Sequence, residues 1–409
     1  MQNFKPITEK LFPPEYQLID GTDEIFELNL ALWEYENLDK EDLIKRSAYF
    51  KSMEGKPTIH YQTCNLQNLE EIHRNSSLRT KAFFLNGKYS TGYATHSLFP
   101  YRGKFHPQMI RSLLNMMGVN PDDIVLDPMS GSATLSVEAN LMGIDSIAVD
   151  VSPFCCLMGR VKTFALNLDS KKLNQITKDQ EKIFEKLNKP KVPDYFIKNS
   201  NDGSKPYYEI ALLAYLDAMG FARRSSKSLN TLFPVVLNRY VATIKNFQTA
   251  REKLDIQIGK SKIIEDSALN LPLEDDEIDG VITSPPYSFA IDYVDNDKPQ
   301  LEYLGYEPAK LKEDMIGLQG RGISEKLELY FNMLDRVFKE LARVTKKGSK
   351  TIFIVGTNDI QTKGVRLETK IKELTERQKF KFLFEILKPI KGLQNTMKEE
   401  YILIFENNK

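Results

Sequence analysis

Residues 124–139 read IVLDPMSGSATLSVEA, and this stretch decides the fold. A short apolar run ends in an acidic residue, Asp127, and is followed by small residues and then by a helix-forming segment. Gly131 permits a tight turn, and the first turn of the following helix offers backbone amides without intrahelical partners. A strand, a glycine turn and a helix N-terminus in this order predict a loop that binds a nucleotide-like cofactor.

Further apolar runs extend this pattern toward the C-terminus, and short runs alternating with helical segments indicate a parallel α/β sheet. Four of these runs read SIAVDV (146–151), SKIIEDS (261–267), DGVITSP (279–285) and KTIFIVG (350–356). Two more, KFLFEILKPI (381–390) and EYILIFEN (400–407), flank a polar loop. We therefore expect an α/β fold with a doubly wound, Rossmann-like sheet, in which an antiparallel terminal pair extends five parallel strands.

The remaining segments suggest a division of the chain into four parts. An N-terminal accessory region covers 1–94 and contains the amphipathic helical stretch GTDEIFELNLALWEYENL (21–38). The two halves of the sheet domain are 95–165, which binds the cofactor, and 261–409, which carries the catalytic residues. Between them, 166–260 is too long for a loop of such a sheet and is predicted to be a basic helical insertion that recognises the target. The sequence does not decide whether the N-terminal region is a DNA clamp, a dimer surface or a lid.

Charge is distributed unevenly along the 409 residues although the net charge is zero. The stretch 160–262 holds 20 basic and 10 acidic residues, which favours contact with a polyanion there. No apolar run reaches the roughly 20 residues that a membrane span requires, and the first residues lack a secretory signal, so a cytoplasmic, nucleoid-associated protein is expected. Neither the three cysteines nor the four histidines have metal-ligand spacing, so no metal is expected.

Acidic residues end three successive strand candidates: Asp127, Asp150 and Asp266. Ligands of open α/β sheets bind at the carboxyl ends of the strands, and an acid there can accept hydrogen bonds from ribose hydroxyls. A carboxylate beside the loop suits the cationic amino acid moiety of S-adenosylmethionine, whereas it would repel the pyrophosphate of NAD. S-adenosylmethionine is therefore the expected cofactor.

The fourth strand candidate runs into Ser284, Pro285, Pro286 and Tyr287. Consecutive prolines stiffen the backbone, so the serine hydroxyl and a nearby carbonyl can be aimed as acceptors at one amino group. The amino group of a nucleobase is a poor nucleophile, and acceptors that draw on its hydrogens favour attack on a methyl sulfonium. Tyr287 offers a flat face on which an extruded base can stack. A strand-ending turn is the simpler alternative.

This tetrapeptide resembles the catalytic motif of the N4-cytosine and N6-adenine DNA amino-methyltransferases. The resemblance extends over roughly 95–405, in the order FHPQMIRSLLN, DPMSGSATLSVEA, AVDVSP, IIEDSA and TSPPY. It implies a SAM-dependent DNA methyltransferase acting on a flipped base, with the serine form of the motif favouring cytosine N4. The cofactor residues that it implies, together with those of the loop itself, are Phe105, His106, Pro107, Asp127, Pro128, Gly131, Ser132, Thr134, Asp150, Val151, Asp266 and Ser267. The chain departs from the family at Ala133, where glycine is usual and alanine is tolerable if φ stays negative.

Other residues are candidates for contact with the substrate. Asp292 and Tyr293 follow the tetrapeptide closely enough to line a base pocket, and Arg321 lies in the glycine-flanked loop GLQGRGI as a phosphate contact or as an ordinary surface residue. In the insertion, arginine and lysine side chains can neutralise DNA phosphates. The candidates there are Arg223, Arg224, Lys227 and Arg239.

Other functions compatible with these motifs remain open. They are an adenine-N6 DNA methyltransferase, an RNA (tRNA) base methyltransferase, a non-catalytic subunit that binds S-adenosylmethionine or DNA, and a nicotinamide enzyme of the same fold. The expected partners are DNA and a cognate restriction endonuclease.

Overall fold

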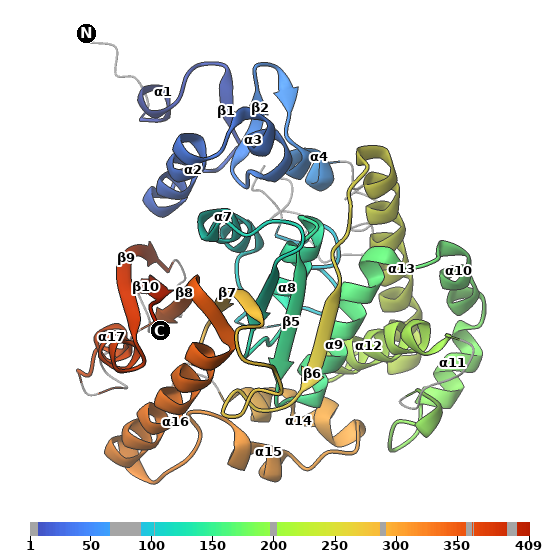
Figure 1. Cartoon of the computed structure of the whole chain (residues 1–409). Coiled ribbons are helices and arrows are strands. Elements are labelled where there is room, and N and C mark those ends of the chain that lie inside the picture. The colour runs from blue at the N-terminus through green and yellow to red at the C-terminus, as the bar shows by residue number, and fades with distance from the viewer. Residues whose placement is uncertain are drawn as a thin grey trace.

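The computed structural model describes residues 7–65, 91–101, 103–196, 203–286, 292–356, 362, 364–390 and 399–409. A seven-stranded sheet with the order β6-β5-β4-β7-β8-β10-β9 forms its centre (Figure 1). Strands β4 to β8 run parallel, whereas β10 is antiparallel to both β8 and β9. The strands are β4 (Ile124–Asp127), β5 (Asp145–Asp150), β6 (Ser261–Glu265), β7 (Ile278–Thr283), β8 (Thr345–Gly356), β9 (Phe380–Pro389) and β10 (Glu399–Asn407). The predicted fold class, five parallel strands with an antiparallel terminal pair, is confirmed.

Both faces of the central strands of this sheet are buried, as their apolar runs require. In β8, Ile352 and Ile354 pack into a core that includes α7, whereas Phe353 and Val355 pack into a core that includes α16 and α17. Alternate side chains of a strand point to opposite faces, so one uninterrupted apolar run serves both cores. The helices on these two faces are α7 (Pro107–Met117), α16 (Gly322–Val344) and α17 (Leu367–Arg377).

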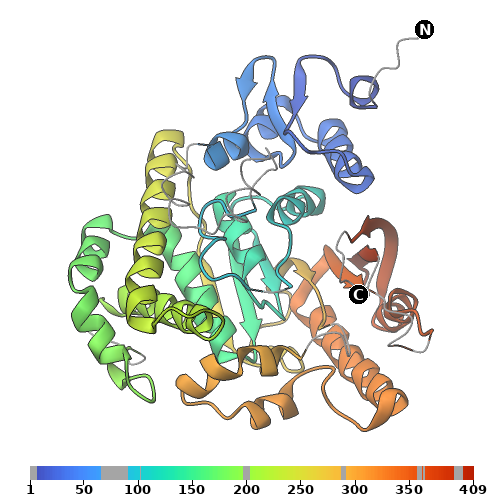
Figure 2. The same ribbon diagram turned by 180° about the vertical axis from the view of Figure 1, so that it is seen from behind.

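The insertion between β5 and β6 is helical, and it lies on the opposite side of the sheet from β9 and β10 (Figure 2). Its two long helices share one hydrophobic core with α9. Asp217, which interrupts the longest apolar run of the sequence, is buried there and accepts hydrogen bonds from Arg239 and Tyr240. The elements of this region are α9 (Pro153–Phe164), η1 (Ala165–Asn167), α10 (Ser170–Lys178), α11 (Gln180–Leu187), η2 (Asp194–Phe196), α12 (Lys205–Ala222) and α13 (Leu229–Leu254).

The charged run KKLNQITKDQEKIFEKLNK (171–189) forms two short helices, α10 and α11, and not one continuous helix. They meet at Asp179, whose φ of −93° and ψ of 12° leave the α-helical region. Aspartate competes for backbone hydrogen bonds and favours helix ends, which gives the break a local cause.

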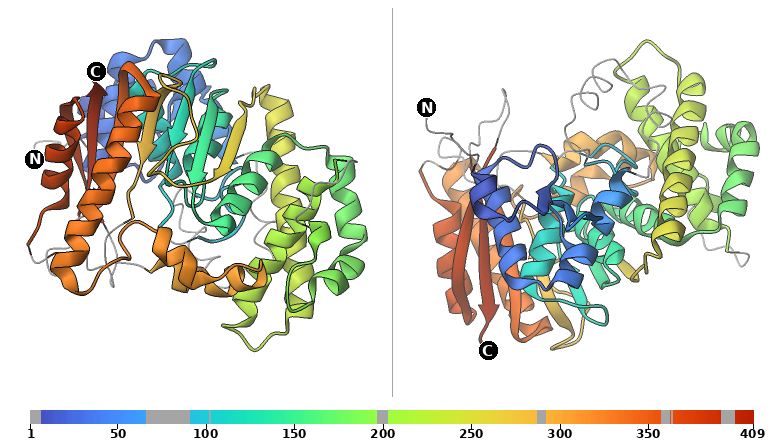
Figure 3. Two further views of the ribbon diagram at one scale, coloured as in Figure 1. Left: turned by 60° about the horizontal axis from the view of Figure 1, so that its bottom comes forward. Right: turned by 90° about the horizontal axis from the view of Figure 1, so that it is seen from above.

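The N-terminal region packs above the sheet and contacts α7 (Figure 3). Buried polar side chains join the two parts: Arg111 donates to the carbonyl oxygen of Arg46 at 2.9 Å, and Asn115 donates to Glu34 at 2.8 Å. Removing one partner of a buried hydrogen bond destabilises the fold, because it leaves a buried polar group unsatisfied. These bonds therefore fix the N-terminal region in one position on α7. Its elements are α1 (Thr8–Leu11), β1 (Tyr16–Leu18), α2 (Ile25–Asn37), α3 (Lys40–Arg46), β2 (Phe50–Met53), β3 (Lys56–Pro57) and α4 (Ile59–Asn65).

Three further helices border the carboxyl ends of the parallel strands. They are α8 (Thr134–Leu141), α14 (Tyr293–Tyr303) and α15 (Pro308–Asp314). Among the described residues, no helix combines the length and the apolar character that crossing a membrane demands.

Candidate active site

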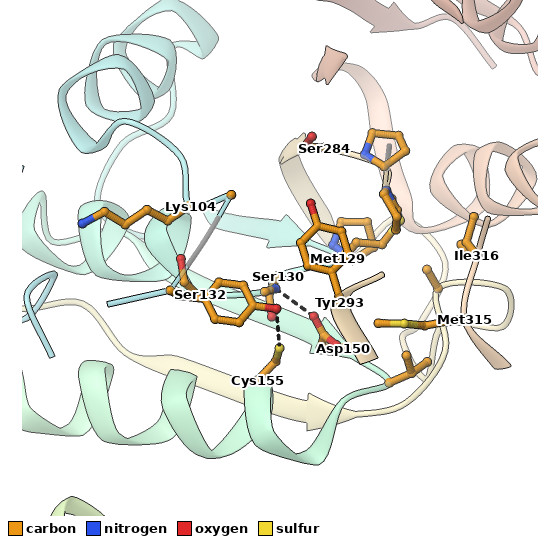
Figure 4. A pocket seen from close by; sticks show the side chains of 18 of the residues that line it. Lys104, Met129, Ser130, Ser132, Asp150, Cys155, Ser284, Tyr293, Met315 and Ile316 are labelled. Atoms are coloured by element: carbon orange, nitrogen blue, oxygen red, sulfur yellow. Dashed lines mark hydrogen bonds between the residues drawn. The ribbon is translucent and has the colours of Figure 1, made fainter. Parts of the chain in front are cut away.

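A cavity of about 880 Å³, measured with its open mouth, lies where β4, β5, β6 and β7 end (Figure 4). Its walls bring together residues from five sequence motifs, which lie between Phe105 and Pro286 in the chain. The predicted site residues that line it are Phe105, Pro128, Gly131, Ser132, Asp150, Val151, Ser267, Ser284, Pro285, Pro286 and Tyr293. The structure therefore places the predicted cofactor loop and the predicted catalytic motif around one space.

The loop after β4 is held against the end of β5 by its backbone. The Ser130 amide donates to the carbonyl oxygen of Val149 at 3.0 Å, and the Gly131 amide donates to Asp150 Oδ2 at 2.7 Å. Gly131 has a φ of +47°, a conformation that glycine adopts without steric penalty. These bonds turn the loop toward the cavity, and α8 then begins at Thr134.

Ala133 does not meet the condition under which alanine would be harmless. Its φ is +58° and its ψ +35°, so the residue is left-handed where the sequence analysis requires a negative φ. This conformation costs an alanine roughly 1–2 kcal/mol. The residue is buried, and its methyl group lies 3.3 Å from the point that a Cβ at Gly159 of α9 would occupy. Glycine, which is usual at this position of the motif, would adopt the left-handed conformation without steric penalty. In this chain Ala133 adopts the same conformation.

Asp150 points into the cavity from the end of β5 and accepts two backbone hydrogen bonds. Oδ2 accepts from Gly131, and Oδ1 accepts from the Ser152 amide at 2.8 Å. Burial raises the pKa of Asp150 to about 6, and the two amides oppose that rise. Each carboxylate oxygen has a second lone pair, so the group could also accept from ribose hydroxyls.

Five residues that the sequence analysis assigns to the cofactor lie behind the cavity wall or beside it. Asp127 is buried and accepts from the Thr283 hydroxyl at 2.8 Å and from the Met129 amide at 3.2 Å. His106 and Pro107 form the start of α7, and burial lowers the pKa of His106 to about 4. Thr134 is buried at the first position of α8. Asp266 is exposed, and the neighbouring Ser267 faces the cavity in its place.

Ser284, Pro285 and Pro286 leave β7 and form part of the cavity wall. The preceding residue, Thr283, is buried and bonded to Asp127, so the strand end is anchored directly before the motif. Tyr287, the fourth predicted catalytic residue, lies outside the described residues. The described part of the motif therefore places a serine hydroxyl on a stiff backbone beside the cofactor loop.

Aromatic and apolar side chains complete the walls. Tyr293, at the first position of α14, faces the cavity as predicted, and Gly103 leaves room for it, because a Cβ at 103 would lie 3.1 Å from the Tyr293 hydroxyl. Sequence reasoning missed Tyr101, whose hydroxyl accepts from the Cys155 thiol at 3.6 Å. It also missed Met315 and Ile316, which follow α15. These residues lie in segments without a helix or strand periodicity. For Tyr101, the one signal in the sequence is that an aromatic residue lies between Pro100 and Gly103.

Two other predicted substrate contacts cap helices. Asp292 is the N-cap of α14 and accepts from the Lys312 ammonium at 2.6 Å. Partial burial opposes its ionisation, but Lys312 and the Asp295 amide lower the pKa of Asp292 overall. Arg321 is the exposed N-cap residue of α16, and its amide donates to Glu325 at 2.7 Å. Neither residue lines the cavity.

The basic residues of the insertion separate into two kinds. Arg239 donates to the buried Asp217 at 2.6 Å, so its guanidinium is engaged within the fold. Arg223, Arg224 and Lys227 are exposed at the turn that joins α12 to α13. The first two also line a second hollow that adjoins the cavity. These three cations are therefore placed where a ligand could reach them.

The side chains around the cavity fit a nucleoside bearing an amino acid group. Asp150 could accept from ribose hydroxyls, Ser132 could bond polar atoms, and apolar side chains could cover a flat base. The apolar residues at the wall are Met129, Ala268, Met315 and Ile316. Among the described residues, no cluster of His, Cys, Asp and Glu could hold a metal ion.

The sequence is similar to known methyltransferases. The family described as "RMKL-like, methyltransferase domain" matches residues 97–189, which include the cofactor loop. Type II methyltransferase M.BsoBI of Geobacillus stearothermophilus is 23% identical over 275 residues, covering 53% of this chain and 54% of that protein. Type II methyltransferase M.MjaII of Methanocaldococcus jannaschii is 39% identical over 103 residues, covering 25% of this chain and 19% of that protein. The chain thus spans about half or less of the length of these relatives.

An RNA-modifying enzyme is also among the relatives. The tRNA (guanine(10)-N2)-dimethyltransferase of Methanothermobacter thermautotrophicus is 36% identical over 53 residues, covering 13% of this chain and 16% of that protein. Among solved structures, a SAM-dependent methyltransferase from Methanosarcina mazei aligns over 72% of this chain and 97% of that one, with 9% identity and a TM-score of 0.34. The fold assignment rests on the strand order given above.

These matches confirm the resemblance to DNA amino-methyltransferases and the expected S-adenosylmethionine cofactor. Residues 97–189 are thus similar to a methyltransferase domain.

Proposed function

We propose that the chain transfers a methyl group from S-adenosylmethionine to the exocyclic amino group of a flipped DNA base, with cytosine N4 as the first choice. One observation carries this proposal: Ser284, Pro285 and Pro286 line the same cavity as Gly131 and Asp150. A hydroxyl acceptor on a rigid turn thereby faces the space in which the loop would hold the cofactor.

The roles of the side chains follow from what each can donate or accept. Asp150 and Ser132 would hold the nucleoside part of the cofactor, and S-adenosylmethionine would supply a methyl group on a positively charged sulfur. The Ser284 hydroxyl accepts a hydrogen bond from the target amino group, which directs the nitrogen lone pair toward that methyl group. As the nitrogen-methyl bond forms, the sulfur-methyl bond would break and its electron pair would return to the sulfur, which becomes neutral. The methylated amino group would then lose one proton to solvent.

An extruded base needs flat walls that exclude water. Tyr293 and Tyr101 line the cavity and offer aromatic faces within it. The exposed Arg223, Arg224 and Lys227 would neutralise backbone phosphates beside the opening. The relatives named as Type II methyltransferases support DNA as the substrate and a companion restriction endonuclease as part of this proposal.

The test is a labelling experiment. The purified protein is incubated with labelled S-adenosylmethionine and unmethylated genomic DNA, and the labelled nucleoside is identified by mass spectrometry. We expect N4-methylcytosine, with a rate about a hundredfold lower in Ser284→Ala because an acceptor for the target amino group is lost. Ser267→Ala is the matched control, since Ser267 lies at the end of β6 and should alter cofactor affinity alone. Label in N6-methyladenine would retain the reaction and overturn the choice of base.

A tRNA base methyltransferase is the second candidate, because the tRNA (guanine(10)-N2)-dimethyltransferase is 36% identical over its matched 53 residues. Serine at 284 argues against it, since enzymes of that kind usually carry aspartate or asparagine there. Label in tRNA with none in duplex DNA would decide for this candidate.

A further inference from the structure

A second hollow of about 960 Å³ opens beside the catalytic cavity and shares two of its walls, Tyr101 and Tyr293. The polar residues that line only the second hollow come from α14 and from the end of α12. They are Arg223, Arg224, Asn296, Asp297 and Gln300. A ligand that fills the catalytic cavity could therefore continue into this hollow past the two tyrosines.

One face of α14 connects the two spaces. Tyr293 begins the helix, and Asn296, Asp297 and Gln300 follow it at the third, fourth and seventh positions. Residues at these intervals lie on one side of a helix. The seven residue steps from Tyr293 to Gln300 rise about 10 Å, on the order of three steps of a DNA strand at about 3.4 Å per step. The hollow thus extends over the distance at which neighbouring nucleotides would lie.

Gln300 is a buried amide with unused hydrogen-bonding capacity. The residue is only 7% exposed, and its Oε1 accepts no hydrogen bond from the described part of the chain. Leaving such an acceptor unsatisfied costs about 1–3 kcal/mol. Gly220 of α12 faces the same amide, because a Cβ at 220 would lie 3.6 Å from Gln300 Nε2. A ligand that donates a hydrogen bond to Gln300 Oε1 would satisfy this acceptor and offset the free-energy cost of leaving it unpaired.

Positive charge lies on the α12 side of the hollow. Arg223 and Arg224 are exposed, and neither forms an ion pair with another described residue. The Arg224 Nε donates to the carbonyl oxygen of Gly220 at 3.0 Å, which leaves its terminal nitrogens available. On the α14 side Asp297 offers no cation, and burial raises its pKa to about 7, so a phosphate fits at the two arginines.

We propose that this hollow holds a nucleotide next to the target base in the same DNA strand, with its phosphate at Arg223 and Arg224 and its base edge at the Gln300 amide. This inference rests on the proposed function. An amide that both donates and accepts can bond a base edge in two places, and a good pair of that kind discriminates between bases by about 1–3 kcal/mol. The hollow is thereby a specificity site, separate from the residues that transfer the methyl group.

The test measures methylation of a duplex oligonucleotide library in which the positions flanking the target base are randomised. Wild-type protein should show a preference at one flanking position of roughly tenfold or more. Gln300→Met, which keeps the side-chain length and removes the amide, should abolish that preference and keep cofactor affinity. Gln300→Glu, which keeps only acceptors, should shift the preference toward a base that presents an amino group there. Gln248→Met is the matched control, because Gln248 is a buried amide of α13 whose Nε2 donates to the carbonyl oxygen of Leu168.

The outcomes separate this inference from the function on which it rests. A wild-type flanking preference that persists in both Gln300 variants overturns the inference and leaves the methyltransferase assignment intact. A wild-type protein that methylates tRNA and no DNA overturns both. If Gln300→Met proves unstable, the changed preference of Gln300→Glu still decides, because loss of stability lowers the rate on every sequence equally.

Discussion

The Thr283 hydroxyl donates to Asp127 Oδ1 at 2.8 Å, and this buried bond ties the strand of the cofactor loop to the strand of the Ser-Pro-Pro motif. Asp127 directly precedes the loop, and Thr283 directly precedes Ser284. Oδ2 of Asp127 has no hydrogen-bond partner among the described residues, and burial raises the pKa of the carboxyl group to about 7. This hydrogen bond therefore sets the distance between the cofactor loop and the Ser-Pro-Pro motif. Because the pKa of Asp127 is about 7, its carboxyl group changes its charge near neutral pH.

Thr283→Val should destabilise the protein in a pH-dependent way. The folded-state pKa of Asp127 is raised above its unfolded value, so the carboxyl group costs stability increasingly from about pH 4 to about pH 7. Above pH 7 the folded group is ionised, and the Thr283 hydroxyl then offsets part of that cost. Without the hydroxyl we expect a loss of about 1–3 kcal/mol at pH 8.5 and a smaller loss at pH 5.5, where Asp127 is neutral. Urea unfolding at the two pH values measures the difference.

Thr351→Val is the matched control for this measurement. Thr351 lies on β8 beside β7, and its buried hydroxyl has no hydrogen-bond partner among the residues described. Its replacement should leave stability unchanged or raise it, with no dependence on pH. Equal losses for the two valine variants would show that the Asp127 bond carries no special weight.

Cofactor affinity should depend on pH through Asp150. Burial raises its pKa to about 6, and ribose hydroxyls bond better to the ionised form, so affinity should strengthen from pH 5 to 7 and level off above. Asp150→Asn should weaken binding about tenfold or more at pH 8 and remove this rise, because an amide nitrogen cannot accept from Gly131 or Ser152. Titration calorimetry with S-adenosylhomocysteine measures both effects.

Asp145→Asn serves as the control at the opposite end of the same strand. Asp145 accepts from the Lys260 amide at 2.7 Å and lies at the start of β5, away from the cavity. The cofactor affinity of Asp145→Asn should depend on pH in the same way as that of the wild type. A wild-type curve that is flat between pH 5 and 7 would assign the ribose to another group.

Strand periodicity and strand-end chemistry predicted the sheet and much of the cavity. Asp150 and Ser284 belong to different strands, yet parallel strands bring their carboxyl ends to one edge, so their approach follows from the sequence. The predicted roles of the individual residues stay predictions. Their meeting around one cavity is what the structure adds.

Contacts between side chains on separate helices could not be predicted in the same way. Arg239 and Asp217 are 22 positions apart, and only the packing of α13 against α12 joins them. Met315 and Ile316 reach the cavity because α14 and α15 return the chain to the strand ends. No local pattern encodes such a return, since the packing of the whole domain sets it.

Substitutions at Ala133 should show how far the left-handed conformation is tolerated. Ala133→Gly removes a conformational penalty of about 1–2 kcal/mol and also a buried methyl group worth about 0.8 kcal/mol, so the net change in stability should stay within about 1 kcal/mol of zero. Ala133→Val adds a β-branched side chain at a buried position with a φ of +58°, and should destabilise by about 2 kcal/mol or more. Thermal unfolding of the two variants measures this, and a valine variant as stable as the wild type would contradict the assigned backbone conformation.

The double variant Arg223→Ala and Arg224→Ala should weaken DNA binding and reduce its dependence on salt. Each phosphate contact contributes about 0.9 to the slope of the logarithm of the binding constant against the logarithm of salt concentration, so the slope should fall by about 2. Fluorescence anisotropy measures this slope at salt concentrations from about 50 to about 200 mM, the range in which phosphate contacts lose affinity. Arg377→Ala is the control, because Arg377 is exposed on α17 at the opposite side of the sheet (Figure 1). A slope that is unchanged in the double variant would mean that DNA approaches from another face, and a slope that also falls in the control would point to general charge in place of a local contact.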